Sequence, residues 1–279
     1  MLAGLSFMCF AAIFIKSAHA PGIVTAFYRM LIGSSVLLPV FLFHYFKNKP
    51  SLPVKGILFA IAGGICFGFD MALWSTGVVA SNATIPTLFA NTAPVWVGIG
   101  SVFIFKEQHK LLFWIGLFLT IAGMPILVKN DFVISNGIIK GALFGLGAGI
   151  FYGIFYMAAQ SGRKLIDTVS FMFINTFSSV IVLFILIIIF GYQLTGYDAF
   201  TYKIFIAFGV GVQVIGWLFI NYSQGYIPAS IIAPTLLGQP LLTALLAVLI
   251  LKESFTFWHI SGGIITISGI YIVHFSQRK

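Results

Sequence analysis

The sequence contains one stretch twice, first as PVWVGIGSVFIFKEQHKLLFWIGLFLTIAGMPI at residues 94–126 and again as PLLTALLAVLILKESFTFWHISGGIITISGIYI at residues 240–272. The copies align without a gap at an offset of 146 residues. The positions that coincide include Pro94/Pro240, Lys106/Lys252, Glu107/Glu253, Gly116/Gly262, Thr120/Thr266 and Gly123/Gly269. Each copy holds two apolar segments and the short charged loop between them. We therefore interpret the chain as a tandem duplication.

The composition is that of a membrane protein. Charged residues make up 8% of the 279 residues and apolar residues 60%, and the mean hydropathy is +1.08, whereas a soluble domain has roughly 25% charged residues. Apolar runs of about 20 residues, enough to cross a hydrocarbon core about 30 Å thick, alternate with short polar segments. The composition excludes a soluble fold and makes the lipid bilayer the expected environment. The two cysteines, Cys9 and Cys66, lie in apolar runs and provide neither a disulfide framework nor metal-ligand spacing.

The apolar runs predict an all-α membrane protein with ten membrane-spanning helices. Their approximate bounds are 2–18, 23–46, 56–79, 82–105, 111–128, 138–159, 168–191, 204–222, 229–251 and 258–275. We expect residues 1–128 to form a first five-helix repeat, residues 138–275 a second, and residues 129–137 a connecting loop. Because five is odd, the second repeat must enter the bilayer from the opposite side, which predicts an inverted repeat. The first run is followed at once by another apolar run and has no small-residue cleavage site, which favours a retained helix over a signal peptide.

Lysine and arginine are distributed unevenly between the two sides of this topology. Nine lie on the side of the N-terminus, namely Lys47, Lys49, Lys55, Lys106, Lys110, Arg163, Lys164, Arg278 and Lys279. Five lie on the other side, namely Lys16, Lys129, Lys140, Lys203 and Lys252. Because cytoplasmic loops carry the excess of positive charge, we expect both termini in the cytoplasm. The net charge of +9 is spread over short loops beside the spans, so it does not indicate a nucleic-acid partner.

Several features distributed over the whole chain form a recognisable combination. They are a first span ending in Lys16, the Phe27–Arg29 step in the second span, the Lys-Glu loops at 106–107 and 252–253, Pro94 and Pro240, and the paired Gly116/Gly123 and Gly262/Gly269 spacings. This combination resembles the EamA branch of the drug/metabolite transporter superfamily. The resemblance implies a ten-helix bundle of two inverted repeats in a bacterial inner membrane, which moves amino acids or other small metabolites by alternating access. Family members often have Gly before the Glu of each charged loop, whereas this chain has Lys106 and Lys252.

Ionisable residues inside the spans are the first candidates for transport. Asp70 lies about 14 residues into the third span, where an unpartnered carboxylate costs a few kcal/mol. Lys16 and Arg29 lie on neighbouring spans at a comparable depth, so we expect an ion pair with Asp70. In the functional interpretation Asp70 responds to protons or binds an amine, and Arg29 or Lys16 anchors a carboxylate. The alternatives are a structural ion pair that joins spans 1, 2 and 3, and for Lys16 a side chain that extends to the membrane interface.

The prolines in the fourth and ninth spans mark a second candidate region. Pro94 and Pro240 each remove a backbone hydrogen bond and interrupt a helix. Asn91 precedes one proline and Gln239 precedes the other, so both can place an amide beside the released carbonyls. Matched interruptions in two repeats are a good pointer to a transport site. The alternative is a packing kink of the kind that membrane helices tolerate.

Aromatic side chains supply the third set of candidates. Trp74 is four residues from Asp70 and shares its helix face, and Tyr152 and Tyr156 share a face of the sixth span. They can line a cavity or stack on a cation, although packing accounts equally well for such residues in a chain that is 16% aromatic. Glycines at four-residue intervals from 141 to 153 give the sixth span a face for close helix packing, within one chain or in a weak homodimer.

The residues do not favour an enzyme. The spans hold one acidic residue and lack the nucleophile and base, carboxylate pair or metal cluster that catalysis would need, and no cofactor is implied. No GxxxxGK[ST] loop is present, so direct ATP drive is not indicated. The sequence therefore predicts a secondary transporter of a small zwitterionic or amine metabolite, with protonation of Asp70 as a candidate coupling step. A monomer or weak homodimer is expected. The alternative function is a passive channel or a lipid-handling membrane protein.

Overall fold

The computed structural model describes residues 1–81, 84–127, 137–239, 242 and 257–276, and every regular element within them is helical. Within these described residues, six helical segments are long and apolar enough to cross a membrane, namely Gly22–Asn48, Val54–Ala80, Ile85–Ile104, Ile139–Arg163, Thr168–Phe190 and Ala199–Gln224. Shorter apolar helices lie at Leu2–Ser17, Leu111–Ile126 and Ile260–Ser276. The predicted all-α membrane fold is thus confirmed for these residues. Of the ninth expected span, only the first part lies within the described residues.

The helices follow the order of the expected spans, with several spans divided into shorter pieces. They are α1 (Leu2–Met8), α2 (Ala11–Ser17), α3 (Gly22–Asn48), α4 (Val54–Ala80), α5 (Thr84–Ala90), α6 (Ala93–Ile104), α7 (Leu111–Leu127), α8 (Ile138–Arg163), α9 (Thr168–Phe190), α10 (Ala199–Ala207), the π-helix η2 (Phe208–Gly216), α11 (Trp217–Gln224), α12 (Ala229–Leu236) and α14 (Phe257–Ser276). Together α10, η2 and α11 form the eighth expected span.

Local sequence explains where the long helices begin and end. Asp167 caps α9, because its side chain accepts hydrogen bonds from the backbone N–H groups of Val169 and Ser170. The same helix ends at Gly191, whose φ of 69° is the left-handed conformation that glycine adopts without strain. Asp198 caps α10 by accepting from the backbone N–H of Thr201.

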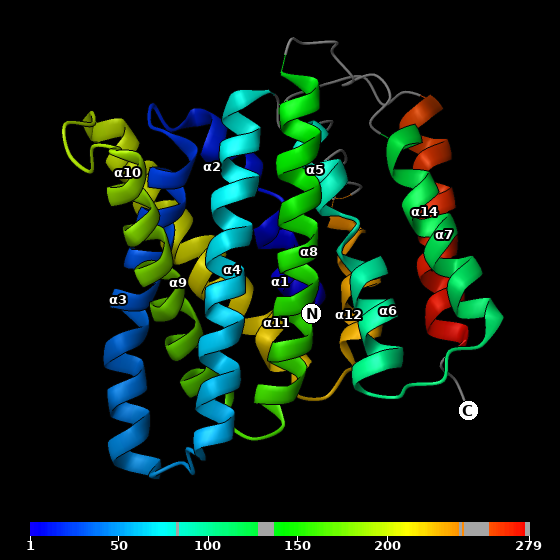
Figure 1. Cartoon of the computed structure of the whole chain (residues 1–279), viewed down its shortest axis with the longest axis horizontal. Helices are drawn as coiled ribbons and strands as arrows, with labels where there is room; N and C mark the ends of the chain where they lie inside the picture. Colours follow the sequence, from blue (N-terminus) through cyan, green and yellow to red (C-terminus); the bar gives the residue numbers. More distant parts are fainter. Residues whose placement is uncertain (82–83, 128–136, 240–241, 243–256, 277–279) are drawn as a thin grey trace.

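The bundle is built around α4, which packs against α8 on one side and α9 on the other (Figure 1). The α3 helix packs against α9 and η2, and α5 and α6 pack against α8. Glycines let α8 approach α5 and α6 closely: a Cβ at Gly149 would lie 3.0 Å from the carbonyl oxygen of Phe89, and one at Gly153 would lie 2.8 Å from Cβ of Trp96. The glycine face of α8 therefore serves packing within the chain.

The two helices α7 and α14 pack mainly on each other and stand at one side of the bundle (Figure 1). A Cβ at Gly116 would lie 2.9 Å from the carbonyl oxygen of Gly269, and a Cβ at Gly123 would lie 2.8 Å from that of Gly262. The earlier residue of one helix thus meets the later residue of the other, so the helices run antiparallel. These four glycines coincide in pairs at the offset of 146 residues.

Interruptions fall at the same place in the two copies. A turn at residues 91–92 separates α5 from α6, and a turn at residues 237–238 follows α12, again 146 residues later. Pro94 explains the first break, because it cannot donate a backbone hydrogen bond to the carbonyl of Ala90. The first turn thus lies where a mid-span interruption was predicted. Pro240 lies outside the described residues.

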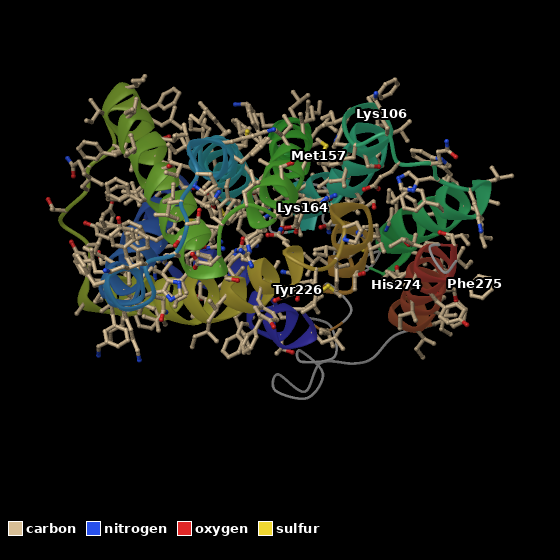
Figure 2. The ribbon with its side chains drawn as sticks, turned by 90° about the horizontal axis from the view of Figure 1, so that it is seen from below. Lys106, Met157, Lys164, Tyr226, His274 and Phe275 are labelled. Carbon is tan, nitrogen blue, oxygen red and sulfur yellow. The ribbon has the colours of Figure 1, made fainter. Side chains whose placement is uncertain are left out.

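The loops gather at two ends of the bundle. One end, which we call the basic end, holds the loops at residues 49–53, 105–110, 164–167 and 225–228 and lies at the bottom of Figure 1. Among the described residues, this end has Lys47, Lys49, Lys55, Lys106, Lys110, Arg163 and Lys164, whereas the opposite end has Lys16, Lys140 and Lys203. Figure 2 looks onto the basic end and labels three of its residues, Lys106, Lys164 and Tyr226.

Candidate binding cavity

A small cavity lies inside the bundle, between α1, α3, α4, α5, α8 and α11. Its volume is about 60 Å³, which is room for a few water molecules. Six of the residues predicted from the sequence line it, namely Arg29, Asp70, Trp74, Asn91, Tyr152 and Gln239. A second cavity of about 20 Å³ shares Asn91, Tyr152 and Gln239 and adds Tyr156 and Pro94. The predicted residues are therefore brought together around one central space.

The guanidinium group of Arg29 contacts three neighbouring side chains, and one of its nitrogens has no partner among the described residues. Its side chain is 1% exposed. Nε donates to Oε1 of Gln213 at 3.0 Å, and the guanidinium carbon lies 4.6 Å from the ring centroid of Phe208. Nη1 donates to the Met71 sulfur at 3.2 Å, and a thioether is a weak acceptor. Nη2 is buried and has no hydrogen-bond partner among the described residues.

Asp70 lines the same cavity from α4 and is 2% exposed. Its Oδ2 is buried and has no donor among the described residues. The expected direct ion pair is not formed: the ion pairs that the described residues make within 4.0 Å all involve histidine, and none joins Asp70 to Arg29 or Lys16. Nη2 of Arg29 and Oδ2 of Asp70 thus both lack a partner among the described residues, and both residues line the same cavity.

Amide side chains from the two helix breaks complete the polar lining. Asn91 lies in the turn between α5 and α6, and its Nδ2 is buried without a partner among the described residues. Gln239 follows the second turn, and its Nε2 donates to the backbone oxygen of Met8 at 2.8 Å. Trp74 donates from Nε1 to the Thr87 hydroxyl at 3.0 Å. Both interruptions of the helical backbone thus contribute an amide to the cavity.

Aromatic rings wall the cavity on the side of α8 and α11. The hydroxyl of Tyr156 donates to that of Tyr152 at 2.6 Å. Trp217 meets Phe67, Phe155 and Tyr152 edge to face, at centroid distances of 4.8, 5.3 and 6.1 Å. Edge-to-face contacts of this kind are a favoured arrangement of aromatic rings, so the rings of this wall pack on one another.

Two residues of the cavity and its support were not predicted from the sequence, and one predicted residue lies elsewhere. Gln213 was missed: it is a lone amide in an apolar run, and it holds Arg29 while donating to the Thr176 hydroxyl at 3.3 Å. Trp217 was missed because a tryptophan in a span is most often packing. Lys16 lies at the end of α2 with its side chain exposed, and it does not line either cavity.

A polar cluster closes the basic end beneath the cavity. Glu107 accepts from the hydroxyl of Ser230 at 2.9 Å and from Nε2 of Gln160 at 3.4 Å. Gln160 in turn accepts the backbone N–H of Ala229 at 2.7 Å, at the start of α12. His109 lies 3.4 Å from the Glu107 carboxylate, and burial lowers the pKa of this imidazole more than the carboxylate raises it. The loop between α6 and α7 is thereby tied to α8 and α12.

The residue before this glutamate has an unusual backbone conformation. Lys106 has a φ of 55°, in the left-handed region that favours glycine. Glycine often stands here in proteins of the family that the sequence resembles, so the turn is kept although the residue differs. This turn carries Glu107 toward Ser230.

A family model described as the EamA-like transporter family matches residues 1–129 and again residues 139–275. The chain belongs to this family. The relatives of this chain include YdfC of Bacillus subtilis strain 168, which is described as an uncharacterised transporter. The two are 23% identical over 269 residues, which cover 91% of this chain and 86% of YdfC. An S-adenosylmethionine uptake transporter of Rickettsia prowazekii strain Madrid E is 30% identical over 106 residues, 37% of this chain and 34% of that protein.

The fold of this chain is also seen in a solved structure. A protein known from its crystal structure superposes with a TM-score of 0.79, covering 100% of this chain and 97% of that one at 13% identity. At this identity the likeness shows the fold alone. The chain is therefore a multi-pass membrane protein of a transporter family, with the expected resemblance confirmed.

Proposed function

We propose that this EamA-family protein is a secondary transporter of a small zwitterionic metabolite, an amino acid or a compound with an amino-acid head. The observation that carries the proposal is the presence in one cavity of two ionisable groups with an atom that bonds to no described residue, Nη2 of Arg29 and Oδ2 of Asp70. Leaving a buried polar group unpaired costs about 1–3 kcal/mol, and leaving an ionised one unpaired costs more. A substrate carboxylate on Arg29 and an ammonium on Asp70 would satisfy both.

The name of one relative supports this substrate class. The Rickettsia prowazekii relative is named as an S-adenosylmethionine uptake transporter, and that compound carries both a carboxylate and an amine. The aromatic rings of Trp74, Tyr152 and Trp217 would then contact the rest of the substrate. Because the cavity of about 60 Å³ holds only a few waters, the substrate must bind in a wider conformation.

Alternating access between two inverted repeats supplies that second conformation. The family model matches the two halves separately, and the turns at residues 91–92 and 237–238 recur at the duplication offset. The duplication offset turns the Gly116–Gly269 contact of α7 with α14 into the Gly262–Gly123 contact, which supports a pseudo-two-fold axis in the membrane plane. We infer that the repeats, residues 1–128 and 138–275, rock about the cavity. The excess of lysine and arginine supports a cytoplasmic location for the basic end.

Uptake of labelled zwitterions into proteoliposomes tests the proposal. The vesicles are compared with and without an inward-acid pH gradient, against protein-free vesicles. We expect saturable accumulation of one compound class, and loss of its gradient dependence in Asp70→Asn if this carboxylate couples transport to protons. Ion flux far above carrier turnover would overturn the proposal in favour of a channel. A protein that moves lipid and none of the zwitterions would overturn it as well.

A further inference from the structure

A row of buried polar groups runs along α11 from the cavity toward the basic end. Trp217, Asn221 and Gln224 are spaced by four and three residues, so they share one helix face. Their side chains are 1%, 4% and 2% exposed. Nε1 of Trp217, Oδ1 of Asn221 and both amide atoms of Gln224 have no hydrogen-bond partner among the described residues. Unpaired buried polar groups are uncommon in proteins, so a row of them needs an explanation.

A second row on α8 runs beside the first. Tyr152, Tyr156 and Gln160 are spaced by four residues; Tyr156 and Gln160 are buried and Tyr152 is half-buried. The rows meet at the level of the cavity, where the rings of Trp217 and Tyr152 lie 6.1 Å apart. The two helices are in contact again nearer the basic end, where Nε of Arg163 on α8 donates to the backbone oxygen of Asn221 at 3.0 Å. Both helices therefore carry uncharged polar groups over the same length of the bundle.

The α8 row ends at the polar cluster of the basic end. Gln160 belongs to the α8 row and also donates to Glu107, whose other oxygen accepts from Ser230. Closure at this point rests on side-chain hydrogen bonds between a loop and two helices. Such contacts can be exchanged for bonds to water without disturbing a helix.

We propose that the two rows form the route by which a small polar solute passes between the cavity and the basic end, and that the Glu107–Gln160–Ser230 contact closes it in this structure. This inference rests on the proposed function. The row side chains are amides, phenols and an indole, which can hydrogen-bond a zwitterion without holding it as tightly as a fixed charge. A path that binds weakly at several sites favours passage over retention.

Thiol labelling tests the route without knowledge of the substrate. The chain has two cysteines, Cys9 and Cys66, so the background is C9A/C66A. Asn221→Cys reports on the route, and Asn175→Cys is the matched control, because Asn175 is also 4% exposed but bonds to the Ala60 carbonyl at the interface of α9 with α4. Each is treated in vesicles with a membrane-impermeant maleimide added from the basic side.

We expect Asn221→Cys to label at least about 10-fold faster once the closing contact is weakened by Glu107→Gln with Ser230→Ala, and Asn175→Cys to be unchanged. Equal labelling rates at both positions, with or without the weakened contact, would overturn the route. If the route opens but no zwitterion is taken up, the proposed substrate class fails and the route stands. If zwitterions are taken up but the route position does not respond, the route fails alone.

A second variant separates a route from a packing role. Gln224→Met keeps the size of the side chain and removes two amide atoms that bond to no described residue. We expect the melting temperature in detergent to stay equal or rise, while the transport rate falls at least about 5-fold. A lower melting temperature with an unchanged transport rate would assign Gln224 to packing and overturn its place in the route.

Discussion

Replacing Asp70 by asparagine gives the sharpest test of the cavity, because the side chain keeps its shape and loses its charge. No described residue donates to its Oδ2, so the variant breaks no hydrogen bond to that atom. In the proposed complex, Asp70 accepts a charge-assisted hydrogen bond from the substrate ammonium, worth about 1.5–3 kcal/mol. At about 1.4 kcal/mol per factor of ten, the affinity should fall about 10- to 150-fold.

Three related solutes separate this effect from general damage: a zwitterion, its decarboxylated amine and its deaminated carboxylate. Asp70→Asn should weaken binding of the zwitterion and of the amine and spare the carboxylate, whereas Arg29→Gln should spare the amine. Competition against labelled substrate in proteoliposomes gives the three affinities. The melting temperature of Asp70→Asn should not fall, because a charge at this depth costs about 2.5–3.5 kcal/mol on insertion scales.

Two results would refute this reasoning. An equal loss for all three solutes would mean that the variant deforms the cavity. Unchanged affinity for the amine would mean that Asp70 does not bind the ammonium. A fall in melting temperature in either case would identify Asp70 as a structural residue.

Four further predictions concern other parts of the molecule. Gln213→Glu gives the cavity arginine a permanent anionic partner, so competition assays should show weaker binding of carboxylates and unchanged binding of amines. Lys106→Gly relieves a left-handed residue that costs about 1–2 kcal/mol, partly offset by about 0.4–1 kcal/mol of unfolded-state freedom, so thermal unfolding should show a gain of at most about 1.6 kcal/mol. Gly123→Ala places a methyl group against the α14 backbone and should destabilise by about 1–3 kcal/mol in the same assay, whereas Gly211→Ala, with nothing within 4 Å of the added carbon, should be nearly neutral. Burial raises the pKa of Asp167, but the hydrogen bonds of its cap and a nearby imidazole outweigh burial and hold that pKa below its ordinary value. The cap therefore stabilises α9 fully above about pH 4, and this stabilisation is lost as the pH falls through the lowered pKa. Asp167→Ala should cost about 0.5–2 kcal/mol near neutral pH and progressively less in thermal melts at lower pH.

The sequence predicted those site residues that are individually unfavourable in an apolar membrane helix. Asp70 and Arg29 stand out because a charge in an apolar run is expensive, and Pro94 because it must interrupt a helix. Gln213, Asn221 and the other neutral amides cost less and do not stand out from an apolar run.

Features that depend on partners far apart in the chain could not be predicted. Glu107 and Ser230 are 123 positions apart, and no local pattern in either segment points to the other. The ion pair expected for Asp70 failed for a related reason, because depth along a span does not give the direction of a side chain around it. The π-helical register of η2, which carries Gln213, likewise has no periodic signal in the sequence.

The contact between α7 and α14 has a consequence for assembly. These helices come from opposite halves of the sequence, and they pack with backbones close enough that a methyl group would not fit at Gly116 or Gly123. Each half of the sequence therefore supplies one helix of a close helix–helix interface. If the gene were divided between the halves, one polypeptide would contain α7 and the other α14. The two separately translated polypeptides could therefore associate in the bilayer through this interface.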